Sequence, residues 1–384
     1  GDLVVEDSKA GNYWSEFNGS RIFFDNQDQA WISAKDGIYT ISLKPSKFKR
    51  LLQNPKNNIS VRGLAEMPDG KILANSYSGL YLIDPVSGYH TLMKNEVYYG
   101  ACRASDNTIW LGCHSFEIEH LSPALAPLND VKAAPSFAKF DEMLRPFEDS
   151  FTGRVYFGTR RNGLLLFNKA AGEMEPYPKL NQSGELATLE ILFLLPTKDY
   201  IWVASSNGLY QLDKEKGIVA RFDGFPENFI FHITAEKNGT FWLSTKGGGL
   251  IHWDSKQNQF KQYSTDNGLS SDIIYAAYDD DQGHLWLPSN YGLMRFEKST
   301  GISNNFLPDD GISFEEFNNT SHLKASDGTF YFGSLNGITA FKPSDIVSDE
   351  FDAPLLVTGY KVLNDNGLVD KFADFRSTNR IVIA

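Results

Sequence analysis

A phrase that recurs eight times constrains this chain more than any other feature of its sequence. Each copy has a turn rich in Asp, Asn or Gly, a strand centred on an aromatic or apolar residue, a second turn that usually ends in Gly, and another apolar strand. The centres of the eight copies are Trp31, Ile72, Trp110, Tyr156, Trp202, Trp242, Trp286 and Tyr331. A period of about 43 residues that holds several short strands is typical of β-propeller blades.

The order of turns and strands in each copy predicts four antiparallel strands, which is one propeller blade. We therefore predict an all-β fold, a β-propeller of four-stranded blades with eight repeats, and keep as the alternative a seven-bladed ring from which the first unit is displaced. The eighth copy stops at Pro343 without an obvious fourth strand. An open ring would expose sheet edges, so we expect an N-terminal segment, residues 3–5 or 13–14, to pair with the last blade.

The residue pattern of the sequence changes beyond the last repeat. The pattern predicts strands of a different module at residues 355–363 and 380–384, with a turn at residues 364–367. So short a segment cannot build an independent sandwich. We predict a propeller domain over residues 1–346 and an incomplete β-sandwich module over residues 347–384.

Charge and hydropathy exclude two classes of partner. The net charge of −12 and the lack of Lys/Arg-rich runs argue against nucleic acid. The longest apolar stretches, such as residues 191–195, are too short to cross a bilayer, so any membrane or targeting segment is expected outside this chain.

The two cysteines, Cys102 and Cys113, fall in neighbouring predicted strands. A turn centred on residues 106–107 places Cys102 opposite Leu111, so we expect two free buried thiols, which leave the redox compartment open.

The repeated aromatic residues invite two interpretations. Flat apolar rings stack well on sugar faces, but a residue in the same place of every blade is better explained as packing between blades. The acidic turn at residues 279–283 suggests calcium, yet Asp and Gly are also what a tight turn requires. We predict no metal and no cofactor, and motifs of nucleophilic, zinc or phosphate chemistry are missing from the sequence.

Residues that differ between the copies are the better candidates for a binding site. In a propeller, the turns between the second and third strands lie on one face, around the mouth of the central channel. Six large side chains in these turns are the predicted ligand-binding residues: Tyr77, His114, Arg160, Arg161, Lys246 and Tyr291. Cations in such turns suit an anionic or hydroxyl-rich ligand, although each is also consistent with ordinary surface charge. The aromatic segment 225–232 is a further candidate, either to cap the channel or to contact a second domain or subunit.

Two stretches carry a resemblance to a known family. Residues 263–272 lead into the strand of Trp286, and residues 309–318, with the sequence Glu-Phe-Asn at their end, lead through residues 326–337 to Pro343. These stretches resemble the periplasmic sensor regions of hybrid two-component systems, which are built of two-component regulator propeller repeats. The strand that ends at Leu363 resembles the start of the Ig-like sandwich that follows such propellers.

The resemblance implies a non-enzymatic, periplasmic domain of a hybrid histidine kinase and response regulator that senses a polysaccharide-derived oligosaccharide. It also implies a homodimer in the full-length sensor and a membrane connection through segments outside this chain. Two alternatives remain. An interaction scaffold would have a small, polar channel mouth and an exposed apolar side, whereas a carbohydrate-active hydrolase or lyase would bring two carboxylates or a Tyr/His pair together in the central funnel.

Overall fold

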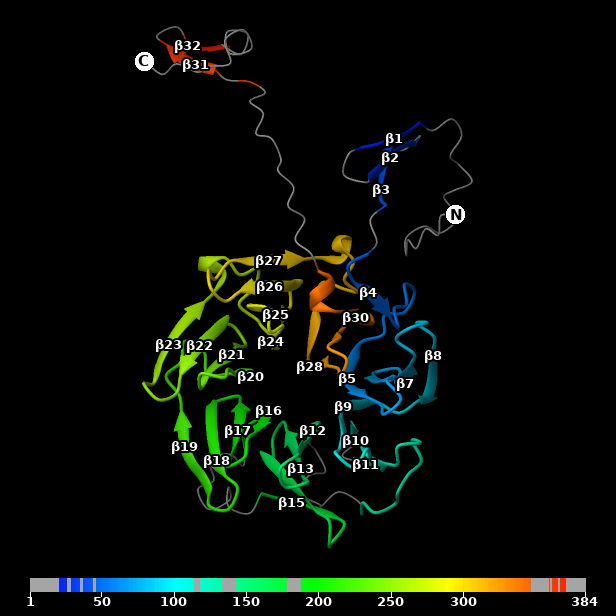
Figure 1. Ribbon diagram of the computed structural model, residues 1–384, viewed down its shortest axis with the longest axis vertical. Coiled ribbons are helices and arrows are strands. Elements are labelled where there is room, and N and C mark those ends of the chain that lie inside the picture. The colour runs from blue at the N-terminus through cyan, green and yellow to red at the C-terminus, as the bar shows by residue number, and fades with distance from the viewer. Residues whose placement is uncertain are drawn as a thin grey trace. The chain divides into compact units, whose positions relative to one another are not determined.

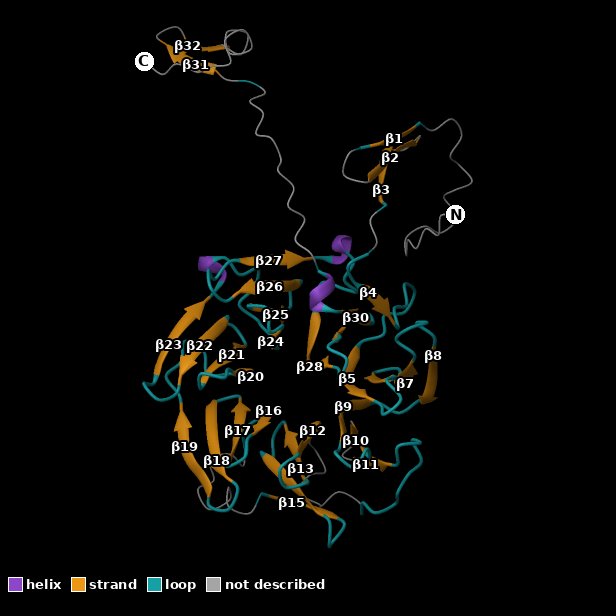
Figure 2. Ribbon diagram, viewed as in Figure 1, coloured by secondary structure: helices purple, strands orange, loops and turns teal. Residues whose placement is uncertain are grey.

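Strands make up nearly all of the regular structure in the computed structural model (Figures 1 and 2). It describes residues 21–25, 29–34, 37–43, 46–113, 118–132, 143–177, 188–346, 359, 361–364 and 367–370. Helix in these residues is limited to short 3-10 turns at Thr265–Asn267, Pro308–Asp310 and Pro343–Asp345. The chain divides into two units, Gly1–Ile346 and Val347–Ala384.

Between Lys49 and Phe341 the described strands form seven antiparallel sheets. Numbered along the chain, these are sheet 1, with β5 (Val61–Glu66), β6 (Ile72–Ser76), β7 (Gly79–Ile83) and β8 (His90–Lys94); sheet 2, with β9 (Tyr98–Arg103), β10 (Ile109–Cys113) and β11 (Ile118–Leu121); sheet 3, with β12 (Met143–Asp149), β13 (Arg154–Thr159), β14 (Leu164–Asn168) and β15 (Glu173–Pro176); sheet 4, with β16 (Ile191–Pro196), β17 (Tyr200–Ser205), β18 (Gly208–Asp213) and β19 (Gly217–Phe222); sheet 5, with β20 (Ile230–Ala235), β21 (Thr240–Thr245), β22 (Leu250–Asp254) and β23 (Gln259–Tyr263); sheet 6, with β24 (Tyr278–Asp279), β25 (His284–Pro288), β26 (Leu293–Glu297) and β27 (Ser303–Phe306); and sheet 7, with β28 (Phe317–Lys324), β29 (Phe330–Ser334), β30 (Ile338–Phe341) and β4 (Lys49–Leu51).

The first strand of each sheet lies nearest the centre of the ring and the fourth lies outermost (Figure 1). Consecutive sheets pack face to face through apolar clusters, and the repeated aromatic residues belong to these clusters. Trp202 packs against sheet 5, Trp242 against sheet 6 and Trp286 against sheet 7, each at most 6% exposed. The interpretation of the repeated residues as packing between blades agrees with these contacts, and the predicted β-propeller fold is confirmed.

The ring closes between sheet 7 and sheet 1. The outer strand of sheet 7 is β4, which pairs with β30 through Leu51 opposite Ile338. On the inner side, Asn318 donates from Nδ2 to the carbonyl oxygens of Val61 (2.6 Å) and Ser334 (3.0 Å), and so joins the two sheets. A segment N-terminal to the ring therefore completes the last blade as expected, but it is β4. Residues 3–5 and 13–14, which the sequence suggested for this role, lie outside the described residues.

The first repeat forms a separate three-stranded sheet of β1 (Ile22–Phe24), β2 (Gln29–Ala34) and β3 (Gly37–Ser42). Its central Trp31 is 40% exposed, whereas the corresponding residues of the seven sheets are buried. Because sheet 7 packs directly on sheet 1, the eight repeats do not all enter one ring in the described part of the chain.

The described part of the second unit is a hairpin of β31 (Lys361–Asn364) and β32 (Gly367–Asp370), with Asn364 opposite Gly367. The remainder of the predicted sandwich strands lies outside the described residues, so that module stays a prediction. Among the residues described, no helix has the length and apolar character needed to cross a membrane.

The predicted register at Cys102 is wrong by one residue. Cys102 lies opposite Trp110, and Leu111 lies opposite Ala101, because the turn is centred on Asp106, with Ala104 N–H donating to the Thr108 carbonyl. Cys102 is a free thiol whose pKa is raised to about 11 by burial. The Cys113 side chain is outside the described residues.

Removal of the Asn318 amide tests the ring closure. Asn318→Ala leaves two buried carbonyl oxygens without a donor, and we expect the free energy of unfolding to fall by about 2 kcal/mol in urea titrations. Asn304→Ala, on the exposed side of β27, is the matched control and should change it by less than about 0.5 kcal/mol. Equal effects of the two substitutions would show that Asn318 does not join the sheets.

Candidate functional site

The turns between the second and third strands share one construction. At the end of the second strand a buried hydroxyl donates to a glycine carbonyl across the turn at 2.7 to 3.0 Å, and each of these glycines has a positive φ: the pairs are Ser76 with Gly79, Thr159 with Gly163, Ser205 with Gly208, Thr245 with Gly249, Ser289 with Gly292, and Ser334 with Gly337. Only glycine adopts a positive φ without strain, which explains why the second turn of the repeat ends in Gly.

These turns are also attached to the following sheet. Gly249 N–H donates to the Asp272 carbonyl, Gly292 N–H to that of Glu315, and Gly337 N–H to that of Ile59, at 2.7 to 2.9 Å. Each acceptor lies in the connection that enters the next sheet, so the turns and these connections form one face of the ring. Sheet 2 departs from this construction, since Cys113 occupies the place of the hydroxyl residue.

A β-bulge near the start of the inner strands is a second feature that recurs on this face, and it turns side chains toward the channel mouth. At the start of the inner strands the pairing register shifts by at least one residue, as in a β-bulge. The extra residue is Arg62 in β5, Tyr99 in β9, Leu192 in β16 and Phe231 in β20. Sheet 6 has an equivalent extra residue between Ile274 and Tyr278, in the segment that contains Tyr275. Bulges next to functional sites commonly re-aim a side chain.

The side chains placed in this way form two groups. In the first, the Arg62 guanidinium lies 4.3 Å from the Tyr77 ring centroid, and the hydroxyls of Tyr77 and Tyr99 are 3.1 Å apart. Burial raises the pKa of Tyr275 to about 12, and the charges that act on it are those of Glu316 and Arg62.

The second group is an apolar cluster of Leu192 and Phe231 with Phe229, Ile273 and Tyr275 at its edge. The ring centroids of Phe231 and Tyr275 are 5.5 Å apart, and the Lys246 ammonium lies 4.4 Å from the Phe229 centroid. We call Arg62, Tyr77, Tyr99, Phe229, Phe231, Tyr275 and Lys246 the mouth residues.

The predicted ligand residues divide between these places. Tyr77 and Lys246 are mouth residues. Tyr291, 49% exposed, is on the β25–β26 turn, and Arg160 and Arg161 are exposed on the β13–β14 turn, so the same kind of turn holds all of them. His114 lies outside the described residues. Their binding role stays a prediction.

Sequence reasoning missed Arg62, Tyr99 and Tyr275. They stand near the start of inner strands, where a bulge reverses the in–out alternation and makes the pattern ambiguous. The aromatic segment 225–232 was noticed, and the structure places Phe229 and Phe231 at the mouth while Ile230 is fully buried.

Below the mouth, the inner strands carry a second layer of aromatic and imidazole rings. His232 lies 4.1 Å from Phe193 and 4.9 Å from His322 between ring centroids, and the Tyr278 hydroxyl is 2.8 Å from His322 Nδ1. Burial, with a smaller effect of the Arg145 charge, lowers the pKa of His232 to about 3, and burial also lowers that of His322 well below its ordinary value. Both imidazoles are neutral at neutral pH.

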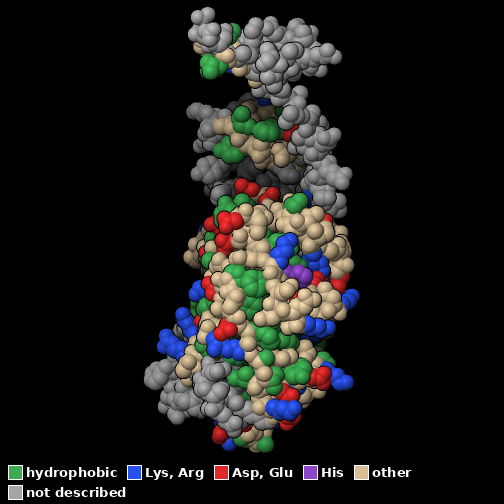
Figure 3. Space-filling view, turned by 90° about the vertical axis from the view of Figure 1, so that its left-hand side faces the viewer, with side chains coloured by type: hydrophobic (Ala, Val, Ile, Leu, Met, Phe, Trp, Pro, Cys, Tyr) green, Lys and Arg blue, Asp and Glu red, His purple; other side chains and the backbone are tan. Residues whose placement is uncertain are grey.

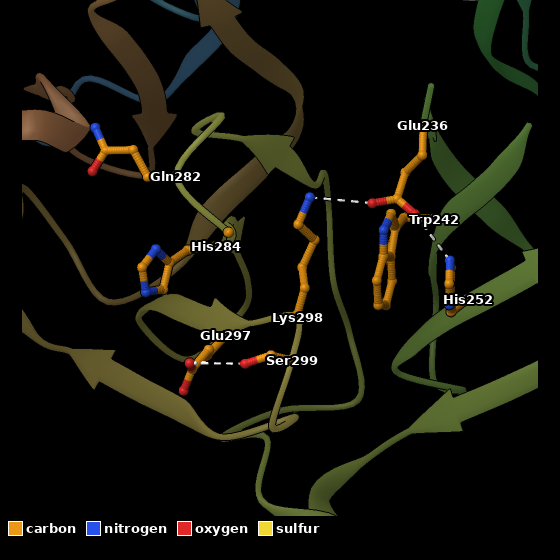
Figure 4. A pocket seen from close by; sticks show the side chains of 9 residues that line it. Glu236, Trp242, His252, Gln282, His284, Glu297, Lys298 and Ser299 are labelled. Atoms are coloured by element: carbon orange, nitrogen blue, oxygen red, sulfur yellow. Dashed lines mark hydrogen bonds and ion pairs between the residues drawn. The ribbon is translucent and has the colours of Figure 1, made fainter. Parts of the chain in front are cut away.

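A cavity of about 440 Å³ lies between sheets 5 and 6, away from the mouth, at the turns that follow the first and third strands (Figure 4). Its polar lining centres on Glu236, which contacts Lys298 (3.1 Å) and His252 (3.1 Å), while His252 stacks on Trp242. Burial favours a raised pKa for Glu236, but its hydrogen bonds and the Lys298 charge outweigh burial and lower the pKa to about 2.

An equivalent pair shows what this arrangement does. Between sheets 3 and 4, Lys214 contacts Asp149 at 2.9 Å with both side chains buried. The acid of one sheet and the lysine of the next thus form a tie that recurs in the ring, and we assign Glu236 and Lys298 the same structural role.

The acidic turn at residues 279–283 also has protein partners. Asp279 contacts Lys298, Asp280 contacts His284, and Asp281 contacts Lys324. Within the described ranges there is no group of three or more His, Cys, Asp or Glu residues able to hold a metal ion.

Acidic, basic and hydrophobic side chains are interspersed on the face shown in Figure 3.

No known protein-family profile matches this chain. It is 25% identical over 227 residues to histidine kinase P4 of Formosa agariphila, a match that spans 55% of this chain and 16% of that protein. The extracellular domain of the putative hybrid two component system BT3049 from B. thetaiotaomicron has the same fold, with a TM-score of 0.73 and 21% identity over 89% of this chain and 47% of that one. The extracellular domain of BT4673 from that organism gives a TM-score of 0.60 and 16% identity over 91% and 48%.

These comparisons confirm the resemblance that the repeats and the Glu-Phe-Asn segment indicated. The chain spans about half the length of the two solved extracellular domains and a smaller part of the kinase. At these identities the solved structures establish the shared fold.

The acid–lysine tie predicts a pH dependence of stability. Because the pKa of Glu236 is about 2 in the folded protein and ordinarily 4.5, its contribution is complete above pH 4.5 and is lost as the pH falls toward 2. Between pH 5 and pH 3, urea titrations should show a steeper loss of unfolding free energy for the wild type than for Glu236→Gln, by up to about 1.4 kcal/mol per pH unit. Glu96→Gln, at an exposed carboxylate, should keep the wild-type slope. A wild-type slope in Glu236→Gln would refute the tie.

Proposed function

We propose that this chain is an extracytoplasmic, periplasmic ligand-sensing propeller of a hybrid two-component sensor, and that an oligosaccharide derived from a polysaccharide binds at its mouth. The observation that carries this proposal is the set of mouth residues, which a bulge in the inner strands and the glycine turns bring together from sheets 1, 2, 5 and 6. The similarity to a histidine kinase and to extracellular domains of putative hybrid systems supports the sensor role.

The chemistry of the mouth suits a hydroxyl-rich ligand. Exposed or half-exposed rings such as Tyr77 and Phe229 offer flat apolar faces to a sugar ring, while Arg62, Lys246 and the tyrosine hydroxyls supply hydrogen-bond partners around them. A binding site of this kind combines apolar walls with a few placed polar groups.

A ligand at the mouth would touch several sheets at once. Occupancy would favour the arrangement of sheets and following module in which these contacts are best, and a signal arises if two arrangements bind the ligand with different affinity. The signal would pass to a kinase through segments beyond this chain, in a homodimer of the full-length sensor.

The enzyme alternative rests on one observation. Tyr278 and His322 form a Tyr/His pair in the channel, the arrangement expected of a hydrolase or lyase. His322 is 1% exposed, however, and burial raises the pKa of Tyr278 to about 12, so the tyrosine does not ionise near neutral pH. The pair fits a neutral polar lining better than an acid–base couple, and we assign the chain no catalytic role.

Binding to an oligosaccharide panel tests the proposal. Calorimetry with the chain should identify an oligosaccharide that binds, and Tyr77→Ala should weaken that binding about tenfold because it removes a ring face and a hydroxyl. Tyr89→Ala is the matched control, since Tyr89 is 72% exposed on the β7–β8 turn, away from the mouth.

Two results would count against this function. Failure of every oligosaccharide to bind would favour the scaffold alternative, in which the propeller only contacts a partner protein. Equal loss of affinity in the two tyrosine variants would place the ligand somewhere other than the mouth.

A further inference from the structure

Two arginines of the inner strands stand out in a chain with a net charge of −12. Arg62 and Arg145 have no carboxylate within ion-pair distance among the described residues, whereas Arg103, Arg154 and Arg221 each have one. Arg50 and Arg295 also have none in these ranges, but both donate to backbone carbonyl oxygens. Arg62 Nε and Arg145 Nη1 are, in addition, buried without a hydrogen-bond partner. An arginine lacking an acid in so acidic a protein requires an explanation.

The surroundings of Arg145 offer the charge no compensation. Its guanidinium carbon lies 5.3 Å from the Phe147 centroid and 5.8 Å from that of Phe193. Phe193 in turn lies 4.1 Å from His232 between ring centroids, so the Arg145 charge stands one ring away from the channel imidazoles, whose pKa values it lowers. These neighbours are neutral, and contacts with aromatic faces recover only part of the solvation that a buried cation loses.

The other polar groups of this layer are already paired with one another. Thr234 Oγ donates to the Ala277 carbonyl and lies 3.3 Å from His232 Nδ1, so this nitrogen carries the proton that the hydroxyl oxygen accepts. The Tyr278 hydroxyl is likewise paired with His322 Nδ1. Arg145 is half-buried as a residue, and its Nη1 is the buried donor of this layer that lacks a partner among the described residues.

We propose that Arg145 is the centre of an anion-binding site in the propeller channel, which takes a carboxylate or sulfate group. A guanidinium presents two parallel N–H groups to such an oxyanion, and the channel rings shield the pair from water. The oxyanion comes either from an acidic sugar, whose remaining part reaches toward the mouth, or from free inorganic sulfate. The site does not depend on the proposed oligosaccharide sensing.

Thermal unfolding with small probes tests this site. In the wild type, glucuronate should raise the melting temperature while glucose, the same sugar without the carboxylate, should not; sulfate is compared with chloride at equal ionic strength. A shift with glucuronate alone identifies an acidic sugar as the source, and a shift with sulfate identifies the inorganic ion; either supports the site. No shift with either anion overturns it.

Substitutions assign the effect to Arg145. Arg145→Met should abolish the anion-dependent shift, and Arg145→Lys, which keeps the charge but loses the paired donors, should raise the half-saturating concentration about tenfold. Arg221→Gln, on the outer strand β19, is the control and should retain the full shift, which also accounts for any general effect of sulfate on stability. An unchanged shift in Arg145→Met refutes the proposal, and if that variant does not fold, an unchanged half-saturating concentration in Arg145→Lys refutes it instead.

These outcomes are separable from those of the oligosaccharide panel. Loss of neutral oligosaccharide binding in Tyr77→Ala concerns the mouth, whereas loss of the glucuronate or sulfate shift in Arg145→Met concerns the channel. Either proposal, oligosaccharide binding at the mouth or anion binding in the channel, can fail while the other stands.

Discussion

The closure of sheet 7 on sheet 1 is the constraint on which the rest of this structure depends. The strand β4 completes sheet 7 from the N-terminal side, and Asn318 joins the inner strands by donating to Val61. A propeller blade cannot bury both of its faces alone, so each inter-sheet core requires the next sheet to be in place. Closure therefore fixes the position of every inner strand, and with it the direction in which each bulged residue points.

The repeat explains both the stability of the ring and the shape of its functional face. Buried aromatic residues fill the spaces between sheets, and the hydroxyl–glycine turns hold one face in a regular form. Function is expected where this regularity varies: the bulge carries an arginine in one sheet, a tyrosine in another and a phenylalanine in a third. The same kind of bulge thus places different side chains around one channel. Arg62 and Arg145, which have no carboxylate partner among the described residues, add positive charge to that channel in an acidic protein.

The sequence predicted the parts of the structure that repeat and failed where a pairing register or a distant partner decides. Trp202, Trp242 and Trp286 were recognisable as core because they recur at one position. The partner of β30 could not be found in this way, since β4 lies far from it in sequence and is only a three-residue strand. Arg62 and Tyr275 were missed because a bulge breaks the alternation on which in–out prediction relies. The single-residue error at Cys102 has another cause, since the turn is centred on Asp106 and not between residues 106 and 107.

The central claim is that the inner-strand bulges build a ligand site at the mouth of the ring. A crystal structure of the chain with a bound oligosaccharide tests it most directly. The account predicts a sugar ring against Tyr77 and Phe229, with a polar group within hydrogen-bond distance of Arg62. A ligand seated instead in the cavity beside Glu236 and Lys298, or on the outer strands, would contradict it.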